Sequence, residues 1–232
     1  MDGPLTMPLT TLNSLMDDLR IGPLPPLLRP DAVWMDEDEA ARRATQRVDD
    51  ELADSLYTLA HPATEYGAVV RTGDQQRSVF AAERGRDVVL AERVGHVVSV
   101  TMLRDRSAMG EFLRRVPDAP PARIHAVNLR RSDLVRSVAT WAGFDSTRGL
   151  PERDVATVAM LLRHPLVGQG ELYVATHDPF GRVALGEPVR YQDYGLGRVL
   201  IVLSDEYFSV AAASRSALTR RLSEELHRIR WC

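Results

Sequence analysis

The sequence predicts an α+β fold built from two related halves, and three observations lead to that prediction. Strand-like runs separated by glycines fill residues 64–102 and again residues 171–212. Helix-like segments precede and follow each set of strands. Short words recur in one order around both sets: Leu-Ala-His-Pro at 59–62 and Leu-Arg-His-Pro at 162–165, then Arg-Ser-Ala at 106–108 and 215–217. A shared order of this kind indicates an internal duplication. Chance matching of short words is the alternative.

The duplication predicts four parts of the chain. They are an N-terminal helix with a proline-rich crossing segment at 1–30, a first α/β repeat at 31–116, a linker with a connecting strand at 117–130, and a second α/β repeat at 131–232. Each repeat is expected to be an antiparallel β-meander with flanking helices, because its connections are short. A pseudo-two-fold axis is expected to relate the two subdomains, since sheets laid edge to edge expose fewer open edges.

The first half begins with an amphipathic helix that Thr10 or Thr11 is expected to cap. Leu12, Leu15, Met16 and Leu19 share one face of this helix. The next segment, GPLPPLLRP at 22–30, is expected to be extended. A second helix is predicted to begin at the capping pair Asp36 and Glu39 and to end near His61, before Pro62. A four-strand meander then fills 64–102, and a helix follows over 109–116.

The second half repeats this order after the proline-rich linker. Its expected elements are a strand at 123–129, a helix bearing Val135, Val138 and Ala142, a helix opening at Pro151, strands at 171–177, 182–191, 198–203 and 207–212, and a final helix with Ser214 as its cap. The clearest local signal is Asp178-Pro179-Phe180-Gly181. Its residues match the preferences of a type I turn, which predicts a hairpin at this point.

The composition excludes several classes of function. The chain has 29 basic and 32 acidic residues, and its net charge of −3 offers no attraction to nucleic acid or to an anionic membrane. All the basic residues are arginine. The only cysteine is Cys232, so no intramolecular disulfide forms. No signal peptide and no apolar run long enough to cross a bilayer is expected, and the cytoplasm is the expected location.

The best candidate for chemistry is His177 with Asp178, with His61 and His164 as companions. A zinc site needs three or four converging ligands, and no metal-binding spacing accompanies these residues. Both other histidines precede prolines at helix ends, where an imidazole often bonds a backbone carbonyl. We expect no metal, no cofactor and no catalytic residue. A small hydrolase or metal-dependent enzyme using His177 and Asp178 is the alternative.

The order of segments resembles the EspG family of cytosolic chaperones in mycobacterial and related type VII (ESX) secretion systems. The resemblance spans nearly the whole chain. It is carried by GPLPPLLRP, LYTLAHPATEYGAVV and RSVFAAERGRDVVLAERVGHVVSVTML in the first half, and by GLPERDVATVAMLLRHP, GQGELYVATHDPFGRV and YQDYGLGRVLIV in the second. The most specific pieces are the pattern from Gly170 to Arg182 and the pair Gly197-Arg198. None of these is a catalytic signature.

The resemblance implies an EspG-like fold and a protein partner. Members bind PE–PPE heterodimers in the cytosol and cover an apolar tip of a helical bundle until export. By analogy, the expected partner contacts are Arg84, Arg86 and Asp87 in a hairpin loop of the first repeat. Strand residues of the second repeat come next: Val199, Ile201 and Leu203. A purely structural adaptor is a further alternative. The sequence leaves open the identity of the cargo and any self-association.

Overall fold

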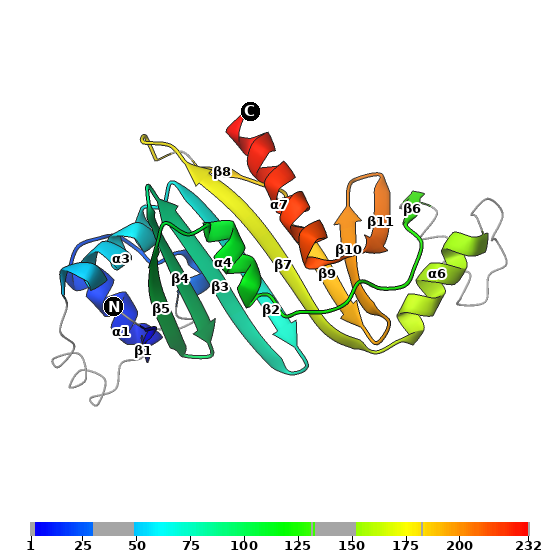
Figure 1. Ribbon diagram of the computed structural model, residues 1–232, viewed down its shortest axis with the longest axis horizontal. Coiled ribbons are helices and arrows are strands. Elements are labelled where there is room, and N and C mark those ends of the chain that lie inside the picture. Colours follow the sequence, from blue (N-terminus) through cyan, green and yellow to red (C-terminus); the bar gives the residue numbers. More distant parts are fainter. Residues whose placement is uncertain (1–2, 30–48, 131, 133–151, 182, 232) are drawn as a thin grey trace. The chain divides into compact units, whose positions relative to one another are not determined.

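The computed structural model describes residues 3–29, 49–130, 132, 152–181 and 183–231. These residues form helices and antiparallel strands, so the expected α+β class is confirmed (Figure 1). The chain divides into two compact units. Unit 1 comprises Met1–Pro117, Leu172–Pro188 and Leu222–Cys232, and unit 2 comprises Asp118–Glu171 and Val189–Arg221. The repeat boundaries at 31–116 and 131–232 stay a prediction. No helix of the described residues is long and apolar enough to cross a membrane.

Unit 1 contains the meander predicted over 64–102. Its strands are β2 (Thr64–Thr72), β3 (Gln75–Arg84), β4 (Asp87–Val94) and β5 (Val97–Arg104), each antiparallel to the next. Each hairpin loop has two residues and begins with a glycine at positive φ, such as Gly85 at 64°. Glycine adopts this backbone conformation without a steric penalty. A further strand that the sequence did not predict, β1 (Leu5–Pro8), pairs with β5.

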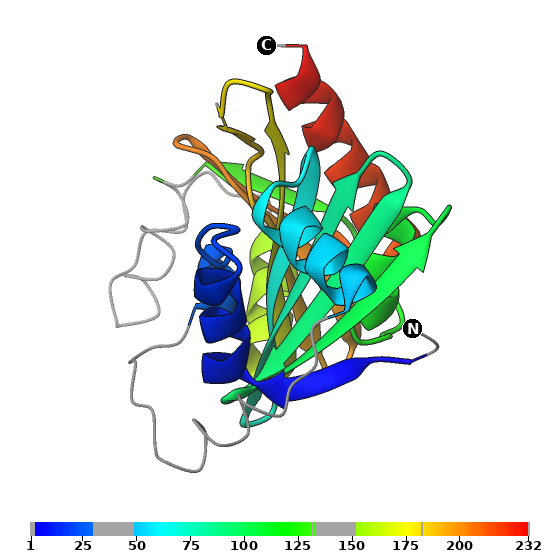
Figure 2. The same ribbon diagram turned by 90° about the vertical axis from the view of Figure 1, so that its left-hand side faces the viewer.

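Helices pack on both faces of the unit 1 strands. On one face lie α1 (Leu9–Asp18), the 3₁₀ helix η1 (Pro26–Leu28) and α3 (Asp50–Ala60), which share an apolar core with β3, β4 and β5. Figure 2 shows α3, in cyan, over these strands. On the other face α4 (Ala108–Arg115) places the Phe112 ring 5.8 Å from that of Tyr66. The alternation of side chains along β2 and β3 separates the two cores.

Three expectations about the N-terminal half are corrected. The cap of α1 is Pro8, because the helix follows β1 directly, and Thr10 and Thr11 lie inside it. The segment at 22–30 is not wholly extended, since η1 turns within it to bury Leu28. The helix that ends at His61 begins at Asp50 and not at Asp36, because Asp49 is its cap and the Asp49 carboxylate accepts the Leu52 amide hydrogen at 2.8 Å.

Two groups of residues that led to the prediction of helices lie outside the described residues. They are Asp36, Glu39, Ala41, Ala44 and Val48 in the first half, and Val135, Val138, Ala142 and Pro151 in the second. The end of α3 at His61 agrees with the prediction from Pro62. The cap of the last helix is also confirmed, because the Ser214 hydroxyl accepts the Ala217 amide hydrogen at 3.3 Å.

Unit 2 is a smaller antiparallel sheet with the strand order β9-β10-β11-β6. Its strands are β9 (Val189–Tyr194), β10 (Gly197–Leu203), β11 (Tyr207–Ala212) and β6 (Val127–Arg130). A core of Ala122, Leu161, Val199 and Val210 joins the strands to α6 (Glu152–Arg163). Two long elements, β7 (Leu166–His177) and α7 (Arg215–Arg230), each contribute residues to both units.

The single strand predicted at 182–191 is in fact two strands. Within the described part of the chain, β8 (Val183–Leu185) pairs with β7 and β9 begins only at Val189. Between them the Gly186 amide donates to the Val174 carbonyl and the Glu187 amide to the Glu225 carboxylate. Pro188 has no amide hydrogen to continue a ladder. The break therefore depends on Pro188, which is a local signal, and on a contact to α7 that local sequence does not encode.

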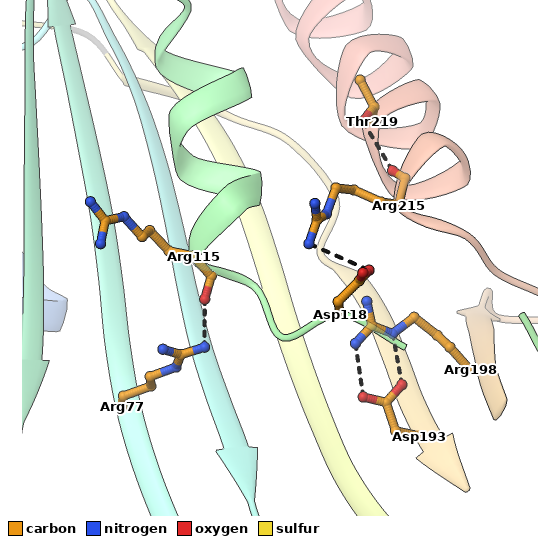
Figure 3. Close-up of polar contacts among 7 residues, drawn as sticks. All are labelled: Arg77, Arg115, Asp118, Asp193, Arg198, Arg215 and Thr219. Carbon is orange, nitrogen blue, oxygen red and sulfur yellow. Dashed lines mark hydrogen bonds and ion pairs between the residues drawn. The ribbon is translucent and has the colours of Figure 1, made fainter. Parts of the chain in front are cut away.

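A buried ion pair lies at the centre of unit 2 (Figure 3). Arg198 is 1% exposed, and its guanidinium donates two hydrogen bonds to the Asp193 carboxylate at 2.7 and 2.8 Å. The same guanidinium lies 4.1 Å from the centre of the Tyr191 ring. Its backbone exchanges hydrogen bonds with Pro120, Ala122 and Ala213. One residue therefore connects β9, β10, the end of β11 and the linker.

Two glycines lie directly beneath tyrosine rings of neighbouring strands. A Cβ on Gly67 would lie 2.1 Å from the Tyr173 ring, and a Cβ on Gly170 would lie 2.3 Å from the Tyr191 ring. Real Cβ atoms do not approach ring carbons so closely, and large rings cannot shift freely in packed structure. Both positions therefore require glycine for space.

The Gly67 position yields a prediction about stability. We expect Gly67→Ala to lower the free energy of unfolding by about 1–3 kcal/mol, because the methyl group overpacks against Tyr173. Chemical denaturation measures the change. The cost should shrink in a Tyr173→Ala background, and Gly3→Ala, with no atom within 4 Å of the added Cβ, should be near neutral. Equal costs in both backgrounds would contradict the steric explanation.

The hydroxyl of Tyr66 is unusually hard to ionise. Burial raises its pKa to about 12, with a smaller contribution from the charge of Glu83 and an opposing one from Arg230. Between pH 10 and 12 the unfolded chain therefore loses this proton while the folded chain keeps it, so stability falls as the pH rises through this window. The chain has no lysine, so no lysine titrates in the same pH range. The effect of tyrosine ionisation on alkaline unfolding is therefore easier to measure.

We expect Tyr66→Phe to reduce the loss of stability between pH 10 and 12. The substitution keeps the aromatic ring against Phe112 and removes the ionisable hydroxyl. Urea denaturation at a series of pH values measures the slope. Tyr57→Phe, at a tyrosine that is 46% exposed, is the control and should show the wild-type slope. A Tyr66→Phe slope equal to that of the wild type would refute this explanation.

Candidate partner-binding surfaces

Arg84, the first candidate contact, ends β3 and is bonded to α3. Its guanidinium donates to the His61 carbonyl at 2.7 Å and lies 4.8 Å from the centre of the Tyr57 ring. The carbonyls at the end of a helix lack partners within the helix, so this arginine satisfies one of them. Arg84 therefore anchors the C-terminal end of α3 to the β3–β4 hairpin, in addition to any contact with a partner.

Arg86 and Asp87 lie at the exposed end of the same hairpin. The Arg86 side chain is 86% exposed and lies 3.9 Å from the Asp105 carboxylate, while Arg104 lies 3.6 Å from Asp87. The Asp105 amide also donates to the Arg86 carbonyl at 3.1 Å. Exposed ion pairs of this length contribute little to stability. These four residues, which we call the β3–β4 charged end, can exchange their present partners for those of another protein.

The apolar candidates of β10 differ in their exposure. Val199 is 1% exposed and belongs to the unit 2 core, Ile201 is partly buried, and Leu203 is 47% exposed. In this conformation Leu203 is therefore the member best placed to touch a partner. Tyr207, at the start of β11, is 38% exposed. It closes the β10–β11 turn, because the Ser204 amide donates to the Tyr207 carbonyl at 2.9 Å. The turn itself carries two acidic residues, Asp205 and Glu206.

His177 and Asp178, the candidates of the enzyme alternative, each have a different partner. His177 Nε2 lies 3.0 Å from a carboxylate oxygen of Glu65, which is 112 residues away in sequence. Asp178 accepts the Phe180 amide hydrogen at 2.8 Å and thereby holds the predicted turn, which the Gly181 amide closes on the Asp178 carbonyl at 3.1 Å. Burial, and then Glu65, raises the pKa of the nearby Tyr173 hydroxyl. The two side chains therefore bond different partners, one on β2 and one within the turn.

Two other histidines also bond segments distant in the sequence. His61 Nε2 lies 2.7 Å from the Ile21 carbonyl, so it bonds the segment after α1 and not the end of its own helix. His125, in unit 2, lies 2.9 Å from the Asp154 carboxylate and close to the Thr157 hydroxyl. In the described ranges no group of three or more His, Cys, Asp or Glu side chains is placed to hold a metal ion.

Sequence reasoning overlooked a set of exposed apolar residues on the β7–β8 hairpin: Phe180, Val183 and Leu185. The turn motif explained Phe180 as part of a turn, and the two others were only included in the strand predicted at 182–191. A usable signal was present, because a large aromatic residue is not among those that a type I turn requires.

Comparison with known proteins places the chain by sequence and by fold. The sequence model of the EspG family matches residues 8–224. No curated protein matches the chain. One similar solved structure is that of the Mycobacterium tuberculosis type VII secretion system chaperone EspG5 in complex with PE25-PPE41 dimer. It is 18% identical, the match covers 97% of this chain and 96% of that chain, and the TM-score is 0.71. The expected family resemblance is confirmed.

The contacts of the β3–β4 hairpin separate two arginines that the sequence treats alike. We expect Arg84→Glu to lower the free energy of unfolding by about 1 kcal/mol or more, because it removes the bond to the His61 carbonyl and the contact with Tyr57. Arg86→Glu should change it by less than about 0.5 kcal/mol. Thermal and urea denaturation measure both. Equal effects of the two substitutions would show that the Arg84 contacts carry no stability.

Proposed function

The chain belongs to the EspG family, and on that premise we propose that it is a cytosolic chaperone of a type VII (ESX) secretion system. In this proposal it binds a PE–PPE-like pair of helical proteins and covers an apolar tip of the pair before export. The observation that carries the proposal is the family match over residues 8–224. The fold similarity to a chaperone solved with its PE–PPE dimer supports it.

The composition of the chain fits this role. A chaperone of this kind needs no catalytic group, and we propose that the chain is not an enzyme. The net charge of −3 does not favour nucleic acid as the partner. A chaperone that holds cargo before export meets it in the cytosol, so we propose the cytosol as the location of this protein.

We propose that the candidate residues divide into contacts and supports. Arg86 and Asp87, in the β3–β4 charged end, would pair with charged cargo residues, and Leu203 would supply an apolar anchor from unit 2. Arg84 and Val199 would support these contacts without touching the cargo, because Arg84 bonds the end of α3 and Val199 packs in the unit 2 core. Ile201, partly buried, lies between these roles. Interfaces commonly combine apolar anchors with a polar rim.

Co-expression with a PE–PPE-like pair from the same secretion locus tests the function. We expect the pair to be largely insoluble alone and to co-purify in soluble form with this chain. Pull-down and the soluble fraction of the cargo measure the two effects. Arg86→Glu should weaken binding while the thermal midpoint of the free protein stays unchanged. Binding without any gain in cargo solubility would favour the structural adaptor, and no binding to any type VII substrate would refute the proposal.

A further inference from the structure

Three large apolar side chains are exposed within residues 180–185 of unit 1. Phe180 is 87% exposed, Val183 57% and Leu185 62%. Val183 and Leu185 are two residues apart on β8 and so project from one face of the β7–β8 hairpin, while Phe180 lies in the connecting turn. Apolar clusters on exposed protrusions are typical of surfaces that a partner covers.

The strand that carries two of these residues is a short edge strand with no charge or proline of its own. Among the described strands β8 pairs with β7 alone. Natural edge strands commonly carry charges, proline or a bulge that prevents pairing with other chains. β8 consists of Val183, Ala184 and Leu185, and the first charge and proline after it are Glu187 and Pro188. A partner that covers β8 would therefore remove its exposed apolar side chains from water.

Hydrogen bonds hold the hairpin at its turn and at its base. At the turn the Asp178 carboxylate fixes the Phe180 amide at 2.8 Å, and Gly181 adopts a φ of 80°. At the base the Glu187 amide donates at 3.0 Å to Glu225, a carboxylate that is only 2% exposed. Arg228 in turn donates two hydrogen bonds to Glu225, at 2.8 and 3.0 Å. A protrusion already held in place loses little conformational freedom on binding.

The size of the hairpin limits what fits it. Even when fully covered, three such side chains bury on the order of 500 Å², less than the roughly 800 Å² per partner of a stable interface. Contact between two copies through this hairpin alone is therefore too small for a dimer, and the hairpin suits one contact within a larger interface. The charged residues of this segment, Asp178, Arg182 and Glu187, carry both signs, so charge alone does not select the partner.

We propose that the β7–β8 hairpin inserts Phe180, Val183 and Leu185 into an apolar groove between two helices of the secretion cargo. This inference rests on the proposed chaperone function and adds a contact element to it. Phe180 is the central anchor, because a protruding aromatic ring that is fully desolvated on binding gives more affinity than its neighbours.

The test uses the full chain and the co-purified PE–PPE-like cargo pair. The variant is Phe180→Ala with Leu185→Ser. The matched control is Val94→Ser with Val97→Ser, since these residues are 55% and 47% exposed at the β4–β5 hairpin of the same unit. We expect the variant to bind the cargo at least about tenfold more weakly, as for loss of interface anchors, and the control to bind within about twofold of the wild type. Titration calorimetry gives the dissociation constants.

A second measurement detects direct contact. A photoreactive benzoylphenylalanine in place of Phe180 should cross-link to the cargo on irradiation, and the same group at Val94 should not. Circular dichroism and thermal denaturation verify that each variant is folded.

The outcomes separate this inference from the function on which it rests. Cargo binding by the wild type with an unchanged affinity of the Phe180→Ala/Leu185→Ser variant overturns the hairpin contact and leaves the chaperone function standing. A cross-link between two copies of this chain, with a smaller mass of the variant in solution, overturns the cargo as the occupant. Absence of cargo binding by the wild type overturns both.

Discussion

The buried guanidinium of Arg198 is the constraint on which unit 2 depends. Removing an arginine from water costs several kcal/mol unless its charge and its donors are matched. Asp193 matches both with two short hydrogen bonds, and the Tyr191 ring covers the guanidinium. The backbone around it brings the linker against β10, where a Cβ on Gly197 would lie 2.7 Å from the Pro120 carbonyl oxygen. Gly197 leaves space for the linker, and the backbone hydrogen bonds of Arg198 attach the linker to β10.

The motif residues that suggest the family also serve packing and turn formation. Gly170 leaves space for the Tyr191 ring, and Tyr191 covers Arg198. Asp178 and Gly181 form the turn of the β7–β8 hairpin. The most specific residues of the sequence therefore secure packing and turns. In a protein of this kind, function depends on what the resulting scaffold presents, and motifs need not mark the contact surface.

What the scaffold presents is a set of short, well-ordered hairpins with different chemistry. In unit 1 the β3–β4 hairpin ends in paired charges and the β7–β8 hairpin ends in exposed apolar residues. In unit 2 the β10–β11 turn combines Leu203 and Tyr207 with two acidic residues. Short loops have little freedom to lose on binding, so specificity comes from the side chains in the turns and at the strand ends. A large helical partner can engage several such ends, each with a modest share of the affinity.

The sequence by itself determined the elements that local chemistry dictates. Glycines at positive φ defined the hairpins of 64–102, Asp178 to Gly181 defined a turn, Pro62 ended α3 and Ser214 capped α7. Tertiary structure decided the rest. β1 is too short for a periodic signal, the separation of β8 from β9 depends in part on Glu225, and Arg84 and Val199 take supporting positions that side-chain type alone does not reveal. The physical reason is that a residue's burial and partners are set by packing between segments distant in the chain, and local propensity carries no information about that packing.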